Sequence, residues 1–302
     1  MAKSKHIEHL PVMCEAATDA LLVGGGGVFV DATFGGGGHS KAILRKIPAD
    51  SSLIALDCDE FAEEHAAGVG DKRFQFFRRN FSQLSEVLAE AGVQAVRGVL
   101  FDLGFSSLQL ACAERGFSFQ RTGDLDMRLD RRQGLTVCQW LRQADEKDIA
   151  RVLKEYGEEP EARRLARALA ARCGDIHNTA DLSRLVAQTK LRPTPGCNPA
   201  TRVFQALRIA VNQELDNLLT GLTAARKHLC VGGRLAVIAF HSLEDRIVKR
   251  FSAGIALPRL GRVDEGDMRS VGGMRRPDKA EIMANPRSRS ACLRVFEKSG
   301  LA

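Results

Sequence analysis

Short apolar runs alternate with stretches of helical spacing along the first third of the chain. The runs at 28–31, 52–57 and 96–102 each end in an aspartate, and helical spacing follows at 39–46 and 81–91. This alternation predicts a parallel sheet with helices on both faces, whose ligands bind beyond the carboxyl ends of the strands. The predicted strands cover residues 28–31, 52–57, 74–78, 96–102, 232–240 and 290–296.

From Cys112 to Pro199 the apolar positions keep helical spacing and no strand-like run occurs. Helices are predicted at 145–156, at 161–172 and from Thr179 onward, and a further helical stretch at 201–229 leads back to the sheet. We therefore expect an α/β domain formed by residues 1–111 and 200–302, interrupted by an all-helical substrate-recognition domain at 112–199.

Composition indicates an ordinary folded protein, because 44% of the 302 residues are hydrophobic and 27% are charged. The first nine residues lack the apolar core of a signal peptide, and four glycines interrupt the longest apolar stretch, 20–30. We expect no contact with a membrane. The eight cysteines are never closer than 24 positions, which excludes paired Cys-x-x-Cys metal ligands and a compact disulfide framework. We expect reduced thiols, a cytoplasmic location and no metal.

The net charge of +7 permits an anionic partner such as RNA. From Pro258 to the end, ten Lys or Arg face six Asp or Glu, so this segment carries more than half of the excess. An RNA contact and a solvated basic loop explain it equally well.

The sequence Asp-Ala-Thr-Phe-Gly-Gly-Gly-Gly-His-Ser at 31–40 joins the first strand to a helix, and Asp57 ends the second strand. A glycine turn and an acid in these positions suit a nucleotide-like cofactor whose ribose hydroxyls bind the acid. The spacing fits both NAD and S-adenosylmethionine. Four successive glycines followed by His-Ser match the dinucleotide fingerprint poorly, which favours the phosphate-free methyl donor.

Several long motifs stand out in the sequence, at 31–40, 101–110 (FDLGFSSLQL), 114–119 (ERGFSF), 125–130 (LDMRLD), 198–209 (NPATRVFQALRI), 240–251 (FHSLEDRIVKRF) and 285–290 (NPRSRS). They resemble the motifs of the bacterial 16S ribosomal RNA cytosine-N4 methyltransferase family, and the resemblance runs from His9 almost to the end of the chain. Leu108 and Asn198 depart from the Pro and His that are usual in this family.

The resemblance implies a Rossmann-like class I methyltransferase sheet and S-adenosylmethionine as cofactor. It implies methylation of a cytosine N4 amine in the 16S rRNA decoding region of the small ribosomal subunit. It leaves the oligomeric state open, a homodimer included. The implied cofactor site consists of Gly37, Gly38, His39, Asp57, Phe81, Asp102 and Gln109. Without the resemblance, Phe81 would be assigned to the hydrophobic core.

The exocyclic amine of cytosine is a weak nucleophile, so catalysis should depend on alignment and on an acceptor for its hydrogens. Asp102, or backbone carbonyls of the loop after it, is the candidate acceptor. The base must be single-stranded or flipped, and stacked on an apolar surface such as Phe105, Phe117 or Phe119. His241 suits a structural role as well as a substrate contact.

A group of arginines forms the candidate RNA-binding surface. Any single one of them is explained equally by a helix face that is exposed to solvent. Arg163, Arg164, Arg167 and Arg172 lie in the predicted insert, and Arg287 and Arg289 lie near the end. Two rival functions share these features: an NAD-dependent oxidoreductase with the same sheet, and a non-catalytic ribosome-binding factor.

Overall fold

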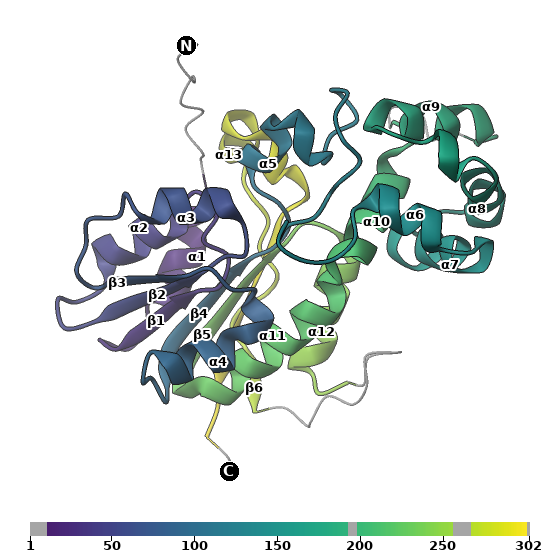
Figure 1. Cartoon of the computed structure of the whole chain (residues 1–302). Helices are drawn as coiled ribbons and strands as arrows, with labels where there is room; N and C mark the ends of the chain where they lie inside the picture. Colours follow the sequence, from purple (N-terminus) through teal and green to yellow (C-terminus); the bar gives the residue numbers. More distant parts are fainter. Residues whose placement is uncertain (1–10, 193–197, 256–266, 301–302) are drawn as a thin grey trace. The chain divides into compact units, whose positions relative to one another are not determined.

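The computed structural model describes residues 11–192, 198–255 and 267–300. The chain forms two compact units, one built from residues 1–104 and 215–302 and the other from residues 105–214. Figure 1 colours both along the sequence.

In the described residues the first unit contains a seven-stranded sheet of order β3-β2-β1-β4-β5-β7-β6 (Figure 1). Strands β1 to β5 run parallel, β7 is antiparallel to β5, and β6 is antiparallel to β7. The prediction of a Rossmann-like α/β sheet is confirmed. The strands are β1 (Val28–Asp31), β2 (Ser52–Leu56), β3 (Phe74–Phe77), β4 (Val96–Asp102), β5 (Leu229–Ala239), β6 (Met268–Ser270) and β7 (Cys292–Lys298).

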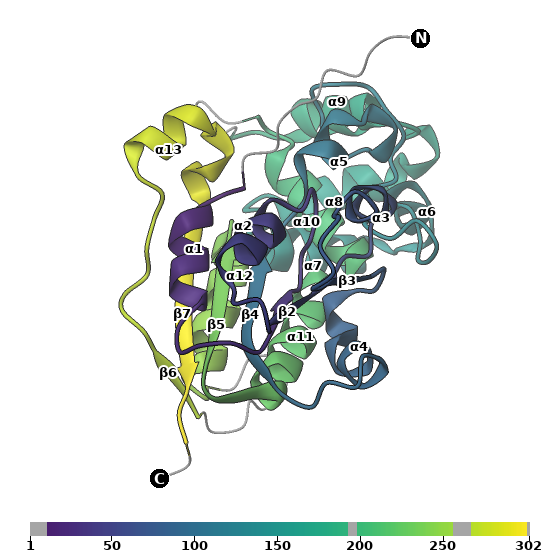
Figure 2. The same cartoon turned by 90° about the vertical axis from the view of Figure 1, so that its left-hand side faces the viewer.

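Helices cover both faces of this sheet because alternate strand residues face two separate apolar cores. One core joins Leu53 and Leu100 to α1 and α2, and the other joins Ile54 and Val99 to α4, α11 and α12. In Figure 2 the purple helices α1 and α2 lie in front of the strands. The helices of this unit are α1 (Cys14–Leu21), α2 (Gly38–Lys46), α3 (Glu60–Ala66), α4 (Leu84–Glu90), α11 (Glu214–His228), α12 (Ser242–Ser252) and α13 (Lys279–Ala284).

Three boundaries differ from the sequence prediction. Strand β5 begins at Leu229, because Gly232 lies inside the strand where its register with β4 shifts, so it is not a turn before the strand. The helix predicted at 201–229 is broken at Gln213, whose φ of 49° is left-handed. The edge strand β6 was not predicted, since three residues are too few to show a periodic pattern.

Among its described residues the second unit contains helices and no strand, and a long loop covers residues 116–136. Its core includes Phe117 and Leu125 before the first long helix, and Val203 and Leu207 after the last predicted insert residue. The compact unit at 105–214 is therefore wider than the range 112–199 expected from the sequence, because α10 packs against α7. Its helices are α5 (Ser107–Ala111), α6 (Val137–Gln143), α7 (Glu146–Gly157), α8 (Ala162–Ala171), α9 (Thr179–Thr189) and α10 (Thr201–Asn212).

Within the described ranges, none of the helices combines the length and the apolar character that crossing a membrane requires. None of the seven cysteines in these ranges forms a disulfide bond, and Cys197 lies outside the described residues.

Candidate active site

The glycine turn connects β1 to α2 through two left-handed residues, Gly35 with φ 52° and Gly37 with φ 77°. A Cβ on Gly37 would lie 2.7 Å from the Phe34 ring, and a Cβ on Gly38 would lie 2.9 Å from Pro11. The chain itself therefore excludes side chains at these two positions. Around a Cβ at Gly35 the nearest heavy atom is the Thr33 carbonyl oxygen at 4.0 Å, so space beside the turn opens there.

Asp57 follows β2 and contacts this turn directly. Its Oδ2 accepts a hydrogen bond from the Gly35 amide at 2.7 Å, and its Oδ1 accepts one from the Asp59 amide at 2.9 Å. Burial raises the pKa of Asp57 to about 6, even though these two hydrogen bonds lower it. The structure thus joins the two features that the sequence proposed for one ligand, and each carboxylate oxygen retains a further acceptor position.

Asp102 ends β4 beside the same turn. Its amide donates to the Thr33 hydroxyl at 2.6 Å, and its Oδ2 lies 3.5 Å from Nδ1 of His39. Its Oδ1 is buried and has no hydrogen-bond partner among the described residues. Burial raises the pKa of Asp102 to about 6; the nearby His39 lowers it, while Asp31 and Glu244 raise it further.

Asp31 organises the turn, a role that sequence reasoning missed. Its carboxylate is fully buried and accepts from the Thr33 amide at 3.2 Å and from the Ser40 hydroxyl at 2.6 Å. Burial raises its pKa. The available signal was that Asp31 ends its strand as Asp57 and Asp102 end theirs, so all three carboxylates lie at one edge of the sheet.

Phe81 begins the short 3-10 helix η1 (Phe81–Gln83), which follows β3 and leads into α4. Its ring meets Phe101 edge to face, with centroids 5.5 Å apart, and packs against the core of the sheet. A Cβ on Gly221 of α11 would lie 2.9 Å from this ring. Phe81 therefore has a packing role, and the residue as a whole is half-buried.

Gln109 belongs to the helical unit, whereas the residues described above belong to the unit that contains the sheet. It forms a capping box with Ser106 at the start of α5, in which its side-chain oxygen accepts from the Ser106 amide at 2.7 Å. The Ser106 hydroxyl accepts from the Gln109 amide in return. Gln109 thus fixes the first turn of α5, and its expected contact with the cofactor stays a prediction.

Phe105 is also in the helical unit, with 37% of its surface exposed. Its ring stacks on Phe117 with centroids 5.8 Å apart, and the Arg208 guanidinium lies over it at 4.7 Å from the centroid. Glu214 holds Arg208 through two hydrogen bonds of 2.8 and 2.9 Å. Phe105 is therefore held rigidly by its own unit, while Phe119 packs edge to face on Phe204.

The six arginines assigned to RNA are all exposed. Arg163 and Arg167 occupy one face of α8, and Arg167 makes a loose ion pair of 3.8 Å with Glu146. Arg287 and Arg289 extend from the 3-10 helix η4 (Pro286–Ser290), where Ser288 between them is buried. Exposed guanidinium groups of this kind can reach phosphates.

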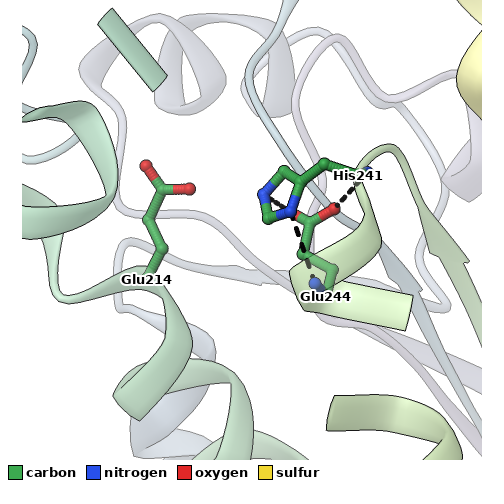
Figure 3. Close-up of side chains that lie close together, drawn as sticks. All are labelled: Glu214, His241 and Glu244. Atoms are coloured by element: carbon green, nitrogen blue, oxygen red, sulfur yellow. Dashed lines mark hydrogen bonds and ion pairs between the residues drawn. The ribbon is translucent and has the colours of Figure 1, made fainter. Parts of the chain in front are cut away.

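His241 caps the N-terminus of α12. Its Nδ1 accepts from the Glu244 amide at 3.3 Å, and Oε2 of Glu244 accepts from the His241 amide at 3.2 Å (Figure 3). This reciprocal arrangement supports the structural role considered for His241. Figure 3 also draws Glu214, the last residue of the helical unit and the partner of Arg208.

A model of the MraW methylase family matches residues 6–299. The chain belongs to this family. The resemblance inferred from the motifs is thereby confirmed, and the chain is a methyltransferase. Membership of a methylase family also sets aside the NAD-dependent oxidoreductase, which shared the sheet and Asp57.

Three curated relatives with the name ribosomal RNA small subunit methyltransferase H are similar over nearly the whole chain. The protein of Ralstonia pickettii (strain 12D) is 45% identical over 98% of this chain and 98% of its own. That of Cupriavidus necator is 47% identical over 97% and 92%, and that of Methylobacillus flagellatus is 46% identical over 97% and 95%. A solved rRNA methylase from Streptococcus thermophilus is similar at a TM-score of 0.44 and 11% identity, covering 94% of this chain and 95% of its own.

Proposed function

We propose that this protein transfers a methyl group from S-adenosylmethionine to the N4 amine of a cytosine in the 16S rRNA of the small ribosomal subunit. The names of relatives at 45–47% identity support the rRNA substrate. The observation that carries the chemistry is Asp102, whose Oδ2 faces His39 while its buried Oδ1 is available at the carboxyl end of β4.

The residues around the glycine turn fit the cofactor. Asp57 can accept the ribose hydroxyls, because it has acceptor positions left after binding Gly35 and Asp59. Phe81, which is only half-buried, supplies an apolar side chain for the adenine. Backbone at Gly35 can approach the amino-acid portion without a side chain in the way. When bound, the cofactor supplies a methyl group on a positively charged sulfur.

Asp102 then has two tasks toward the amine. Its Oδ1 accepts a hydrogen bond from the amino group and so aligns the nitrogen, and it takes up the proton that this nitrogen loses after methylation. Both tasks require the ionised carboxylate. With a pKa raised to about 6, Asp102 is ionised at neutral pH and is a stronger base than an exposed aspartate.

Two groups of exposed arginines bind the RNA. The helical unit is the substrate-recognition domain. Arg163 and Arg167 on α8, and Arg287 and Arg289 on η4, bind phosphates by charge and shape. The target cytosine is turned out of its helix and stacks against an apolar side chain such as Phe105. A protein acting on ribosomal subunits works in the cytoplasm.

Mass spectrometry of rRNA nucleosides tests this function. Cells lacking the gene should lose N4-methylcytosine from 16S rRNA, the wild-type gene should restore it, and the Asp102→Asn gene should not. An unchanged N4-methylcytosine signal without the gene would refute the product. RNA binding without any transfer of label from methyl-labelled cofactor would identify a non-catalytic ribosome-binding factor instead.

A further inference from the structure

The His39 ring is buried and fixed at both of its nitrogens. Its Nε2 lies 3.0 Å from the Val12 carbonyl oxygen, and its Nδ1 lies 3.5 Å from Oδ2 of Asp102. A carbonyl oxygen only accepts, so Nε2 must carry a hydrogen. In the neutral ring Nδ1 then presents a lone pair toward a carboxylate oxygen. Two facing lone pairs repel, so this geometry calls for one proton between Nδ1 and Oδ2.

The surroundings of the pair oppose an ionised Asp102, and the His39 ring is the group that favours it. His39 is 4% exposed, and acidic groups approach the pair from several elements: Asp31 from β1 and Glu244 from α12 both raise the pKa of Asp102. The thiol of Cys14 in α1 is neutral, because burial raises its pKa to about 11. Among these groups His39 alone opposes the protonation of Asp102.

We propose that His39 is a positioning residue for methyl transfer: anchored on Val12, it holds Oδ2 of Asp102 across one proton and leaves Oδ1 to accept the proton of the amine. This inference rests on the proposed function. The amine nitrogen would form its new bond to the methyl carbon as the bond from that carbon to the sulfonium sulfur breaks, with the electron pair staying on sulfur. The nitrogen releases one proton, which passes to Oδ1. The proton on Nδ1 stays in place. His39 therefore acts by keeping Asp102 ionised and oriented, and it does not touch the substrate.

Two variants separate this role from simple packing. His39→Gln can still donate to the Val12 carbonyl but places no donor at Asp102, whereas His39→Asn can donate to Asp102 but loses Val12. Neither carries a charge, so both should raise the pKa of Asp102, by about one pH unit. His65→Asn is the matched control, because His65 is exposed on α3 and contacts the Phe61 carbonyl instead.

Carbon-13 NMR of labelled aspartate measures this titration in the protein alone. In the wild type, nitrogen-15 NMR of the His39 ring should show an inflection at the pH where Asp102 titrates. This second measurement needs no variant, so it holds even if a substitution at position 39 prevents folding. An Asp102 titration that leaves the His39 ring signals unchanged, or that is the same in the variants as in the His65 control, would overturn the proposal.

Measurements of methyl-transfer activity test the proposal independently. We expect His39→Gln to lower kcat by about tenfold or more with little change in KM, and to move the acid side of the pH profile upward. His39→Asn should retain more activity than His39→Gln, because it keeps a donor at Oδ2. The opposite order would show that the Val12 contact matters and would overturn the positioning role. If the wild type transfers no methyl group to rRNA, the proposed function fails, while the NMR titrations still decide the coupling of His39 and Asp102.

Discussion

Replacing Asp102 by asparagine should stabilise the protein at neutral pH while abolishing methyl transfer. Burial raises the pKa of Asp102 from 3.8 to about 6. An acid whose pKa is higher in the folded than in the unfolded chain destabilises the fold once it ionises. The cost is absent below about pH 4, grows between about pH 4 and 6, and is complete above that range. At about 1.4 kcal/mol per pH unit it amounts to about 3 kcal/mol.

Asparagine has nearly the same shape and no charge, so it should remove this cost. Thermal unfolding followed by circular dichroism, from pH 4 to 8, measures the difference between the two proteins. The melting temperatures should agree near pH 4, and the variant should melt on the order of 5–10 °C higher at pH 8. A difference that does not change with pH, or a variant that loses stability as pH rises, would refute the reasoning.

Asp71 provides a control of opposite sign. It accepts hydrogen bonds from Arg73, which lower its pKa to about 2. Its contribution to stability is present above about pH 4 and is lost as the pH falls toward 2. Asp71→Asn should therefore melt at a lower temperature than the wild type at pH 8, in the same assay that shows Asp102→Asn to be more stable.

The cofactor affinity of the wild type, measured by calorimetry, should fall as the pH drops below about 6, since protonation of Asp57 removes the charge from the ribose acceptor. Asp57→Asn should bind about tenfold more weakly at pH 8. Lys190→Met should lower the free energy of unfolding by about 3 kcal/mol in urea, because Lys190 is the counter-charge of the fully buried Glu159, 2.8 Å away. Charge reversal at both Arg287 and Arg289 should weaken RNA binding in filter assays and reduce its salt slope by about one for each arginine that contacts phosphate.

Each of these expectations has a matched control. Asp57→Asn should bind the cofactor equally at pH 5 and 8, and a persistent pH dependence would assign the titration to another group. Replacing both Lys190 and Glu159 by methionine should cost less than Lys190→Met alone, and a larger loss would contradict the burial argument. Charge reversal at the exposed Lys72 and Lys227 should leave the RNA salt slope unchanged. An equal decrease of the salt slope in this control would show that the effect of the arginines comes from the net charge of the protein alone.

The sequence predicted the sheet and the glycine turn well, because both leave local patterns. Strand β4 has the predicted bounds. Asp57, the acid expected at the end of the second strand, accepts a hydrogen bond from the glycine turn. The spacing of the glycines and Asp57 fitted both a methylase and an NAD-dependent enzyme. The motifs shared with the family decided in favour of the methylase.

The parts that escaped prediction depend on contacts between distant residues. His39 lies next to Asp102 although 63 positions separate them in the sequence, and Arg208 of α10 lies over the ring of Phe105, which precedes α5. No local pattern encodes such pairs. Gln213 interrupts the helical stretch with a left-handed φ of 49°, and neither a glycine nor a proline marks this position in the sequence. Phe34 and Pro11 leave no room for side chains at Gly37 and Gly38, which the sequence pattern does not reveal, and the contact of these two glycines with the cofactor stays a prediction.

Methyl transfer to purified small ribosomal subunits from cells that lack the gene tests the central claim most directly. With methyl-labelled S-adenosylmethionine, the wild-type protein should place label on the N4 of a cytosine in 16S rRNA, and Asp102→Asn, although folded and more stable, should place none. Equal labelling by the two proteins, or label on any other atom, would contradict the assignment of Asp102 as the acceptor for the amine.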